Sequence, residues 1–386
     1  MAQRLDTVII GGGAMGSATA WSLAGRGHAV TLLEQFEPGH KRGASHGASR
    51  NLSFAYADAH YLELLAEALP LWSALEEESG VRVFSPTGVV NHGPNASYDL
   101  VHDALHAHGF DAAFLSPQEA SERWAGIRFD TRVLFTPQGG QLNADAAVRA
   151  FTDAAARAGA DVRHGARVVA LRIVGDKEVR LTVETADGTE QLIARTVVVA
   201  AGAWTSKLLD GAVPIPRLTV TQEQPAHFAI ADAGAVWPGF NHRPDLPAAG
   251  YDYWYSGVYG MLTPGEGVKA GWHAVGPVVD PDHRDFTAEP EQLRALRRYA
   301  RDWLPGVDSE SLVEISCTYT LTDDENFVLD RVGPVVVGAG FSGHGFKFTP
   351  AVGRVLADLV LGTTAAPEFF SAARPRSGSL FRAARA

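Results

Sequence analysis

The chain has little cysteine, no long apolar run and no excess of positive charge. Cys317 is its only cysteine, so the chain can form no internal disulfide. No apolar stretch is long enough to span a bilayer. Acidic residues number 44 against 33 lysines and arginines, and the formal charge of -11 disfavours nucleic acid or an anionic membrane as a partner. The histidines lack the spacing of metal ligands, so we expect no metal.

These absences favour a cytoplasmic protein. The first β-branched run begins within a few residues of Met1, which leaves no room for a signal peptide. A length of 386 residues, of which 46% are hydrophobic and 20% charged, is typical of a globular chain. Length alone predicts about two domains.

The first forty residues carry the clearest pattern in the chain. A buried strand over 7–10 runs into Gly11-Gly12-Gly13-Ala14-Met15-Gly16, and a helix is expected over 17–26. A second strand over 29–33 ends at Glu34. A strand, G-x-G-x-x-G, a helix and a strand closed by an acid form the context of a dinucleotide-binding fingerprint.

Each part of that fingerprint has a physical task. Gly11 allows the tight turn, Gly13 lets the backbone approach a pyrophosphate, and Gly16 lets helix and strand pack closely. The helix N-terminus offers N–H groups to the phosphates. Glu34 can accept hydrogen bonds from ribose hydroxyls and repels a 2′-phosphate. The pattern does not distinguish FAD from NAD, and a glycine-rich turn without a ligand is the alternative interpretation.

Two later segments resemble the first unit in that a buried strand leads into small or glycine-rich residues. The strand over 196–200 ends in small residues, 201–203, followed by Trp204, where a cofactor can lie against the backbone; an interior strand and turn is the alternative. The strand over 335–337 leads into the glycine-rich loop 338–347, and a helix follows from Thr349 to about Leu361.

Other segments are less specific. The polar loop over 38–49 is long enough to suggest a binding loop. An amphipathic helix is expected over 61–78 with a bend at Pro70, and Ser116 and Glu119 form a capping box. From Val220 to Ser311 prolines and aromatics increase, which indicates an antiparallel sheet. Its cluster of Tyr251, Tyr253, Trp254, Tyr255 and Tyr259 fits a substrate wall or a sheet core equally well.

Taken together, these motifs resemble the monomeric sarcosine oxidase and N-methyltryptophan oxidase family, FAD amine oxidases that include the fructosyl amino acid oxidases. The resemblance covers nearly the whole length. It is carried by the N-terminal fingerprint and by Ser45-His46-Gly47 with Arg50, Ala201-Gly202-Ala203-Trp204, Val268-Lys269 with His273, Cys317-Thr318-Tyr319-Thr320, and Gly340-Phe341-Ser342-Gly343-His344-Gly345-Phe346-Lys347-Phe348.

The resemblance implies an α/β fold with a Rossmann-like FAD-binding domain of the p-hydroxybenzoate-hydroxylase type and a second, antiparallel-sheet substrate domain. We expect the discontinuous FAD-binding domain to comprise residues 1–80, 143–219 and 312–386. The substrate domain then comprises residues 81–142 and 220–311.

The resemblance also implies roles for individual residues. Cys317 falls where the family attaches FAD covalently, although an unpaired cysteine is most often a small buried hydrophobe. Lys269 matches the lysine beside flavin N5 that promotes reaction with O2, and the period of a strand puts it on one face with His273. A solvated strand lysine is the alternative for Lys269.

The candidate residues form three groups. The catalytic candidates are Lys269, His273, Arg50 and Tyr259. The substrate-binding candidates are Lys347, Ser53, Tyr319 and Gly345. The cofactor-binding candidates are Gly11, Gly13, Ala14, Met15, Gly16, Glu34, Ser45, His46, Arg50, Val168, Ala201, Gly202, Trp204, Cys317, Gly343, His344, Gly345, Phe346 and Lys347.

One position departs from the family. Relatives that oxidise sarcosine usually carry a second arginine, which pairs with the substrate carboxylate, three residues after Arg50; here that residue is Ser53. We therefore expect an N-substituted amino acid bulkier than sarcosine, such as an N-methyl or fructosyl amino acid. The expected enzyme is a monomer that uses O2 and forms an imine and hydrogen peroxide. A dehydrogenase of the same fold with another acceptor and a noncatalytic flavin-binding subunit are the alternatives.

Overall fold

The first strand and helix form where the sequence predicts them. The computed structural model describes residues 3–375, in which β1 (Gln3–Ile10) is followed by α1 (Ala14–Ala24) and β2 (Val30–Glu34). Helix α1 begins three residues earlier than its apolar period indicates, because its first turn grows directly from the tight turn at the glycines. Gly25 caps its other end.

The first sheet is built from three distant parts of the chain. Its strand order is β10-β11-β12-β1-β2-β9, with β21 paired to β12 and β20 paired to β21. Strands β9, β2, β1, β12 and β21 pair in parallel, whereas β10, β11 and β20 join antiparallel. The remaining strands of this sheet are β9 (Asp161–His164), β10 (Arg167–Ile173), β11 (Val179–Thr185), β12 (Gly188–Val199), β20 (Val328–Val332) and β21 (Val335–Ala339).

Four helices pack together beside this sheet. Helix α1 contacts both α5 (Ala144–Arg157) and α8 (Thr349–Leu361), and α2 (Ala59–Ser79) contacts the same two. A Cβ on Gly353 of α8 would lie 2.6 Å from the backbone of Ala18, so this glycine permits the close approach of α8 to α1. Helix α2 continues through Pro70 from its N-cap at Asp58 to Gly80.

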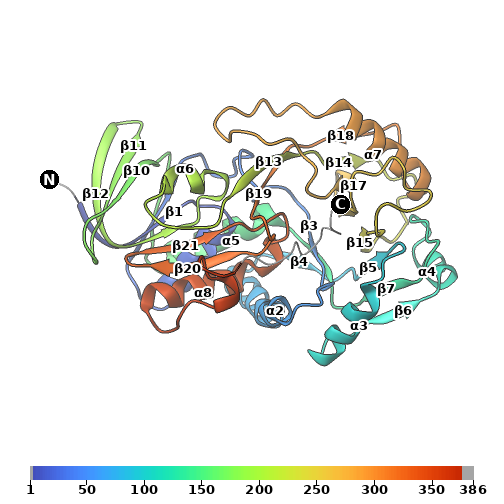
Figure 1. Ribbon diagram of the computed structural model, residues 1–386, viewed down its shortest axis with the longest axis horizontal. Coiled ribbons are helices and arrows are strands. Elements are labelled where there is room, and N and C mark those ends of the chain that lie inside the picture. Colours follow the sequence, from blue (N-terminus) through green and yellow to red (C-terminus); the bar gives the residue numbers. More distant parts are fainter. Residues whose placement is uncertain (1–2, 376–386) are drawn as a thin grey trace.

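The second sheet has the order β18-β14-β17-β16-β15-β5-β7-β6. Figure 1 shows β5, β6 and β7 at the end of the molecule opposite β10, β11 and β12. Its strands are β5 (Val89–His92), β6 (Ala113–Leu115), β7 (Val133–Thr136), β14 (Ala226–Phe228), β15 (Gly239–His242), β16 (Val258–Thr263), β17 (Gly267–Trp272) and β18 (Val313–Glu314).

The antiparallel sheet indicated over 220–311 is present with one exception, and a helix accompanies it. Strand β15 pairs in parallel with β5, and the range also contains the helix α7 (Pro290–Trp303). Buried residues of α7 recur at helical spacing at Leu296, Tyr299, Ala300 and Trp303. Tyr251 and Trp254 pack against Tyr299 and Trp303, so these two aromatics belong to the sheet core and not to a substrate wall.

Two small sheets connect the larger ones. Strand β3 (Arg50–Leu52) pairs with β8 (Gly140–Leu142), which also pairs with β4 (Phe84–Ser85). Strand β13 (Thr219–Glu223) pairs with β19 (Cys317–Leu321). The other helices are α3 (Tyr98–Ala107), α4 (Pro117–Arg123), α6 (Thr205–Leu209), η1 (Gly202–Trp204), η2 (Phe346–Phe348) and η3 (Glu368–Phe370).

This architecture confirms the predicted α/β class with a Rossmann-like unit and a second sheet. The capping box at the start of α4 is confirmed as well, since Ser116 and Glu119 bond each other's backbone. We retain the division at residues 80, 142, 219 and 311 as a proposal; residues 376–386 of its last segment lie outside the described residues. No helix in residues 3–375 is both long and apolar enough to cross a membrane.

Candidate active site

A cavity of about 880 Å³ runs from the N-terminal glycine loop to the second sheet. Every candidate residue from the sequence except Gly16 lines this cavity. Gly16 lies beneath the loop instead, where a Cβ would come within 1.8 Å of the carbonyl oxygen of Gly11. The structure thus brings together residues from both sheets and from the loops between them.

The glycine loop forms one end of the cavity as a turn that side chains would block. Gly11 has a φ of +104°, and a Cβ there would lie 2.5 Å from the carbonyl oxygen of Ala200. No side chain caps α1 at Gly13. The first turn of α1 borders the cavity, where its positive end favours an anion such as a phosphate.

Glu34 is fixed at the end of β2 by backbone N–H groups. Its Oε2 accepts a hydrogen bond from Gly12 N at 2.7 Å, and its Oε1 accepts one from Phe36 N at 2.9 Å. Across the loop, Ser45 Oγ accepts from Ala14 N at 3.0 Å. A carboxylate held this way retains lone pairs that ribose hydroxyls can use. The loop, the helix end and the acid fit a dinucleotide such as FAD.

The loop over 38–49 covers the middle of the cavity. Arg50 holds this loop by donating to the carbonyl oxygens of Ser49 at 2.8 Å, of Ala44 at 3.0 Å and of His46. Burial and the positive charge of Arg50 lower the pKa of His46 to about 3, so its imidazole is neutral. Its Nε2 is buried and has no hydrogen-bond partner among the described residues, which suits a ring that faces a bound ligand.

Lys269 projects into the cavity from the second sheet. Its side chain is buried at 6% exposure, and its Nζ donates to the carbonyl oxygen of Ser49 at 2.5 Å. Burial and the positive charge of Arg50 lower the pKa of Lys269 to about 7. His273, four residues along the chain, also lines the cavity, as the period of a strand predicts.

Lys347 reaches the same cavity from the first sheet's side, in η2. Its Nζ donates to the Tyr56 hydroxyl at 3.0 Å and to the His344 carbonyl oxygen at 2.8 Å. His344 Nε2 lies 3.0 Å from the Glu325 carbonyl oxygen and must donate to it. Its Nδ1, 3.1 Å from the Tyr56 hydroxyl, is then the acceptor. Burial and the positive charge of Arg243 lower the pKa of Lys347 to about 7.

The remaining substrate-binding candidates surround these lysines. Tyr319 packs against Gly343, where a Cβ would lie 2.1 Å from the ring, so a glycine is required at that position. Burial raises the pKa values of Tyr259 and Tyr319 above their usual range, so both hydroxyls keep their protons. Ser53 Oγ accepts a hydrogen bond from Asn241 Nδ2 at 3.3 Å.

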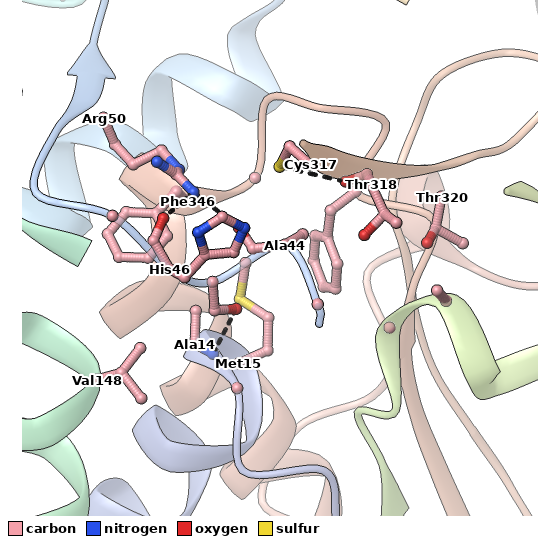
Figure 2. Close-up of a pocket in the computed structure, with 18 of the residues that line it drawn as sticks. Ala14, Met15, Ala44, His46, Arg50, Val148, Cys317, Thr318, Thr320 and Phe346 are labelled. Atoms are coloured by element: carbon pink, nitrogen blue, oxygen red, sulfur yellow. Dashed lines mark hydrogen bonds between the residues drawn. The ribbon is translucent and has the colours of Figure 1, made fainter. Parts of the chain in front are cut away.

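Cys317 begins β19 and lines the cavity on the side facing the loop over 38–49. Figure 2 shows Cys317 of β19 together with His46 and Arg50 of the N-terminal segment around the same part of the pocket. The cysteine is partly exposed and not in a disulfide. In residues 3–375, no group of three or more His, Cys, Asp or Glu side chains is placed to hold a metal ion.

Tyr56, Asn241 and Arg243 also line the cavity, and none of them is among the sequence candidates. Tyr56 lies three residues after Ser53. Its role depends on its hydrogen bond to Lys347, which the sequence does not indicate. Asn241 lies in β15 and Arg243 follows that strand directly. Strand β15 pairs with β16, whose residues Tyr259, Met261 and Thr263 line the cavity. No motif or period in the sequence marks Asn241 or Arg243.

Comparisons with known proteins agree with this geometry. A family model described as FAD dependent oxidoreductase matches residues 6–359. The monomeric sarcosine oxidase of Bacillus sp. (strain NS-129) is 32% identical over 375 residues, covering 93% of each chain. The N-methyl-L-tryptophan oxidase of Yersinia pestis (strain Pestoides F) is 30% identical, covering 91% of this chain and 94% of that relative.

Among solved structures, the chain is similar to NikD, described as an unusual amino acid oxidase essential for nikkomycin biosynthesis. The structure of its Tyr258Phe variant superposes with a TM-score of 0.84 at 27% identity, covering 96% of this chain and 98% of that one. An L-proline dehydrogenase from P. horikoshii shares the fold, with a TM-score of 0.80 at 23% identity.

Proposed function

The chain belongs to the family of FAD-dependent oxidoreductases, and from this premise we propose that it oxidises the C–N bond of a secondary amino acid. The observation that carries the proposal is the pair of buried lysines, Lys269 and Lys347, in the cavity that also holds the dinucleotide loop. The relatives named as sarcosine and N-methyl-L-tryptophan oxidases support it. The products are an imine, which water hydrolyses to an aldehyde and an amine, and hydrogen peroxide.

Bound FAD would supply the redox chemistry, which is acceptance of a hydride from the carbon beside nitrogen and transfer of two electrons to O2. The glycine loop and the end of α1 hold its phosphates, and Glu34 holds a ribose. His46 and Arg50 shape the loop beside its ring system.

The two lysines have separate tasks in this proposal. Lys269 donates one hydrogen bond to Ser49, and its other N–H groups can stabilise negative charge that develops on oxygen. Lys347, held by Tyr56 and His344, presents a positive charge to the substrate carboxylate. In both cases the cation lies in a site with little water, where electrostatic attraction is strong.

The substrate is proposed to be larger than sarcosine. Ser53 is nearly buried at 9% exposure and bonds Asn241, so the position offers neither a positive charge nor a long side chain. A bulkier N-methyl or fructosyl amino acid uses the space that an arginine would fill.

One experiment tests the proposed function. The purified holoprotein is mixed without oxygen with a panel of N-methyl, N-fructosyl and cyclic amino acids, and loss of the oxidised-flavin absorbance is followed. Air is then admitted and peroxide is measured. Bleaching followed by stoichiometric peroxide supports an oxidase. Bleaching without peroxide in air indicates a dehydrogenase, and no bleaching with any substrate indicates a noncatalytic flavin-binding subunit.

The FAD is proposed to be covalently attached through Cys317. The thiol is the chain's only one, it lines the cavity and it is in no disulfide. After acid denaturation, mass spectrometry should find the flavin on the polypeptide of the wild-type protein. Cys317→Ser should release the flavin, and release from the wild type as well would contradict the proposal.

We further propose that the enzyme works as a monomer in the cytoplasm. The acidic composition and single cysteine support this location, and relatives named as monomeric support the oligomeric state. Light scattering of the holoprotein and fractionation of the cells that make it test the two points separately.

A further inference from the structure

Arg243 stands at the point where the second sheet meets the cavity. It follows β15 directly, and its backbone is fixed on both sides: its N–H donates to the His92 carbonyl oxygen at 2.9 Å, and its carbonyl oxygen accepts from Asn95 Nδ2 at 2.9 Å. Asn241, two residues earlier, also lines the cavity. Residues two apart on an extended strand face the same way, so both side chains point to the cavity.

The neighbouring strand leaves room for the arginine side chain. A Cβ on Gly257 would lie 2.8 Å from Cγ of Arg243, closer than atoms approach without a shift. Gly257 therefore provides a groove in which the aliphatic stem of Arg243 rests. Arg243 is half-buried and lines the cavity.

Arg243 and Lys347 lie close enough to affect one another. The positive charge of Arg243 contributes, after burial, to the lowered pKa of Lys347. It also acts on Tyr56, whose hydroxyl accepts the hydrogen bond from Lys347 Nζ at 3.0 Å. Arg243, which follows β15, and Lys347, in η2, thus line one cavity with their charges close enough to interact. A carboxylate between them gains from both charges, and a guanidinium can bind it with two parallel hydrogen bonds.

The position of Ser53 explains why the cation comes from β15. Ser53 accepts a hydrogen bond from Asn241, so β15 approaches directly beside this short side chain. Arg243, which follows β15, can thus supply the positive charge that is absent at Ser53. We propose that Arg243, together with Lys347, binds the substrate carboxylate and selects amino acids against simple amines. This inference rests on the proposed function and assigns the recognition of its substrate.

The test compares carboxylate binding in three variants of the holoprotein. Arg243→Met removes the charge and keeps much of the stem, and Arg243→Lys keeps the charge. Arg128→Met removes an exposed arginine that does not line the cavity. Acetate and butyrate are titrated against the change in flavin absorbance, with butyramide as the uncharged probe. Arg243→Met should weaken binding of both acids at least about tenfold, because a desolvated ion pair loses one partner.

The other variants fix the interpretation. Arg243→Lys should recover most of the affinity, and Arg128→Met should match the wild type. Butyramide should bind all forms alike. If Arg243→Met binds the acids within about twofold of the wild type, or loses acid and amide equally, Arg243 is a packing residue and the inference is wrong.

A second measurement uses proton uptake. A carboxylate that settles beside Lys347 restores the proton that burial and Arg243 remove, so binding at pH 8 should take up a proton from the buffer. Calorimetry in two buffers of different ionisation enthalpy measures this uptake. Lys347→Met should abolish it, and binding without uptake by the wild type would contradict the shared carboxylate site.

Failure of the carboxylate site can be distinguished from failure of the proposed reaction. If no amine is oxidised but the acids bind through Arg243, the proposed reaction fails and the carboxylate site stands. If a secondary amino acid is oxidised, Arg243→Met should raise its KM at least about tenfold with little change in kcat, as expected for uniform binding. Gly257→Ala, which displaces the arginine stem, should move KM in the same direction.

Discussion

The two sides of the cavity each contribute one buried lysine, and a different arginine lowers the pKa of each. Lys269 comes from the second sheet, donates to Ser49 of the N-terminal loop and has its pKa lowered by burial and by Arg50 of that loop. Lys347 comes from the C-terminal glycine loop, and its pKa is lowered by burial and by Arg243 beside β15. Each lysine is thus tuned by an arginine from the other side.

The difference lies in the hydrogen bonds. Lys269 Nζ donates to one backbone carbonyl oxygen, which leaves N–H groups directed at the cavity. Lys347 Nζ donates to a carbonyl oxygen and to Tyr56, which continues the chain of hydrogen bonds to His344. The first arrangement suits a small, transient partner such as O2, and the second suits a partner that must be held in one orientation. Removing each lysine separately tests this comparison.

Lys269→Met should have the largest effect. Loss of the cation should slow reoxidation of the reduced flavin by about a thousandfold, which corresponds to ~4 kcal/mol of transition-state stabilisation. Reduction by substrate without oxygen should change much less. Stopped-flow absorbance measures the two half-reactions separately, with Lys347→Met as the matched control. Equal losses in both half-reactions would contradict the division of tasks.

Lys347→Ala should affect binding in place of the oxygen reaction. Removing one partner of a desolvated pair costs about 2–5 kcal/mol, so carboxylate-bearing substrates should bind about 30-fold more weakly or worse. The decarboxylated amine should be unaffected. Steady-state KM values and ligand titrations measure the change. Wild-type turnover of the amine as efficient as that of the acid would show that no carboxylate is recognised.

The pH dependence of flavin reoxidation tests whether the charge of Lys269, and not its size, accelerates the reaction with O2. With a pKa of about 7 instead of 10.5, Lys269 carries a proton below pH 7 and loses it as the pH rises through 7. If the charge accelerates the oxygen reaction, its rate should fall about tenfold between pH 7.5 and 8.5, where the protonated fraction falls by nearly that factor. Dithionite-reduced enzyme mixed with oxygen avoids the titration of the substrate. Lys269→Met should show a flat profile, and a flat wild-type profile would exclude the charge as the cause.

Ser53→Arg should have the smallest effect, with opposite signs for two substrates. The new arginine fills the space beside Asn241 and adds a charge, so sarcosine should improve severalfold and a bulky N-substituted amino acid should become severalfold worse. Ser53→Ala removes the hydroxyl without adding charge and serves as the control. A gain or a loss shared by both substrates would mean that Ser53 does not set substrate size.

The parts of the site that could be predicted are those written in consecutive residues. The strand ending at Ile10, the glycines and Glu34 follow from local geometry, because a tight turn at φ +104° requires Gly11 whatever the rest of the chain does. Lys347 and Cys317 followed from a resemblance in continuous motifs. Each of these residues belongs to a motif whose members are neighbours both in the sequence and in space.

Arg243 and Tyr56 could not be found this way. Arg243 lines the cavity beside β16, where it meets residues from distant parts of the chain. Tyr56 matters through a hydrogen bond to Lys347, which is 291 residues away. Helix α7 is a different case. Its buried residues at 296, 299, 300 and 303 have helical spacing, and the aromatic and proline content of the surrounding segment hid that signal.

The pairing of β12 with β21 bears on how the protein is made. The end of β12, Val197–Val199, is completed by Val335–Val337, a segment that leaves the ribosome long after β1 and β2. Until then the growing chain exposes an unpaired strand edge, which is a site for aggregation. Lys347 follows that segment in the chain and arrives later still. From the place of this one strand in the sequence we therefore expect the growing chain to need chaperone protection and to bind FAD only after β21 has paired.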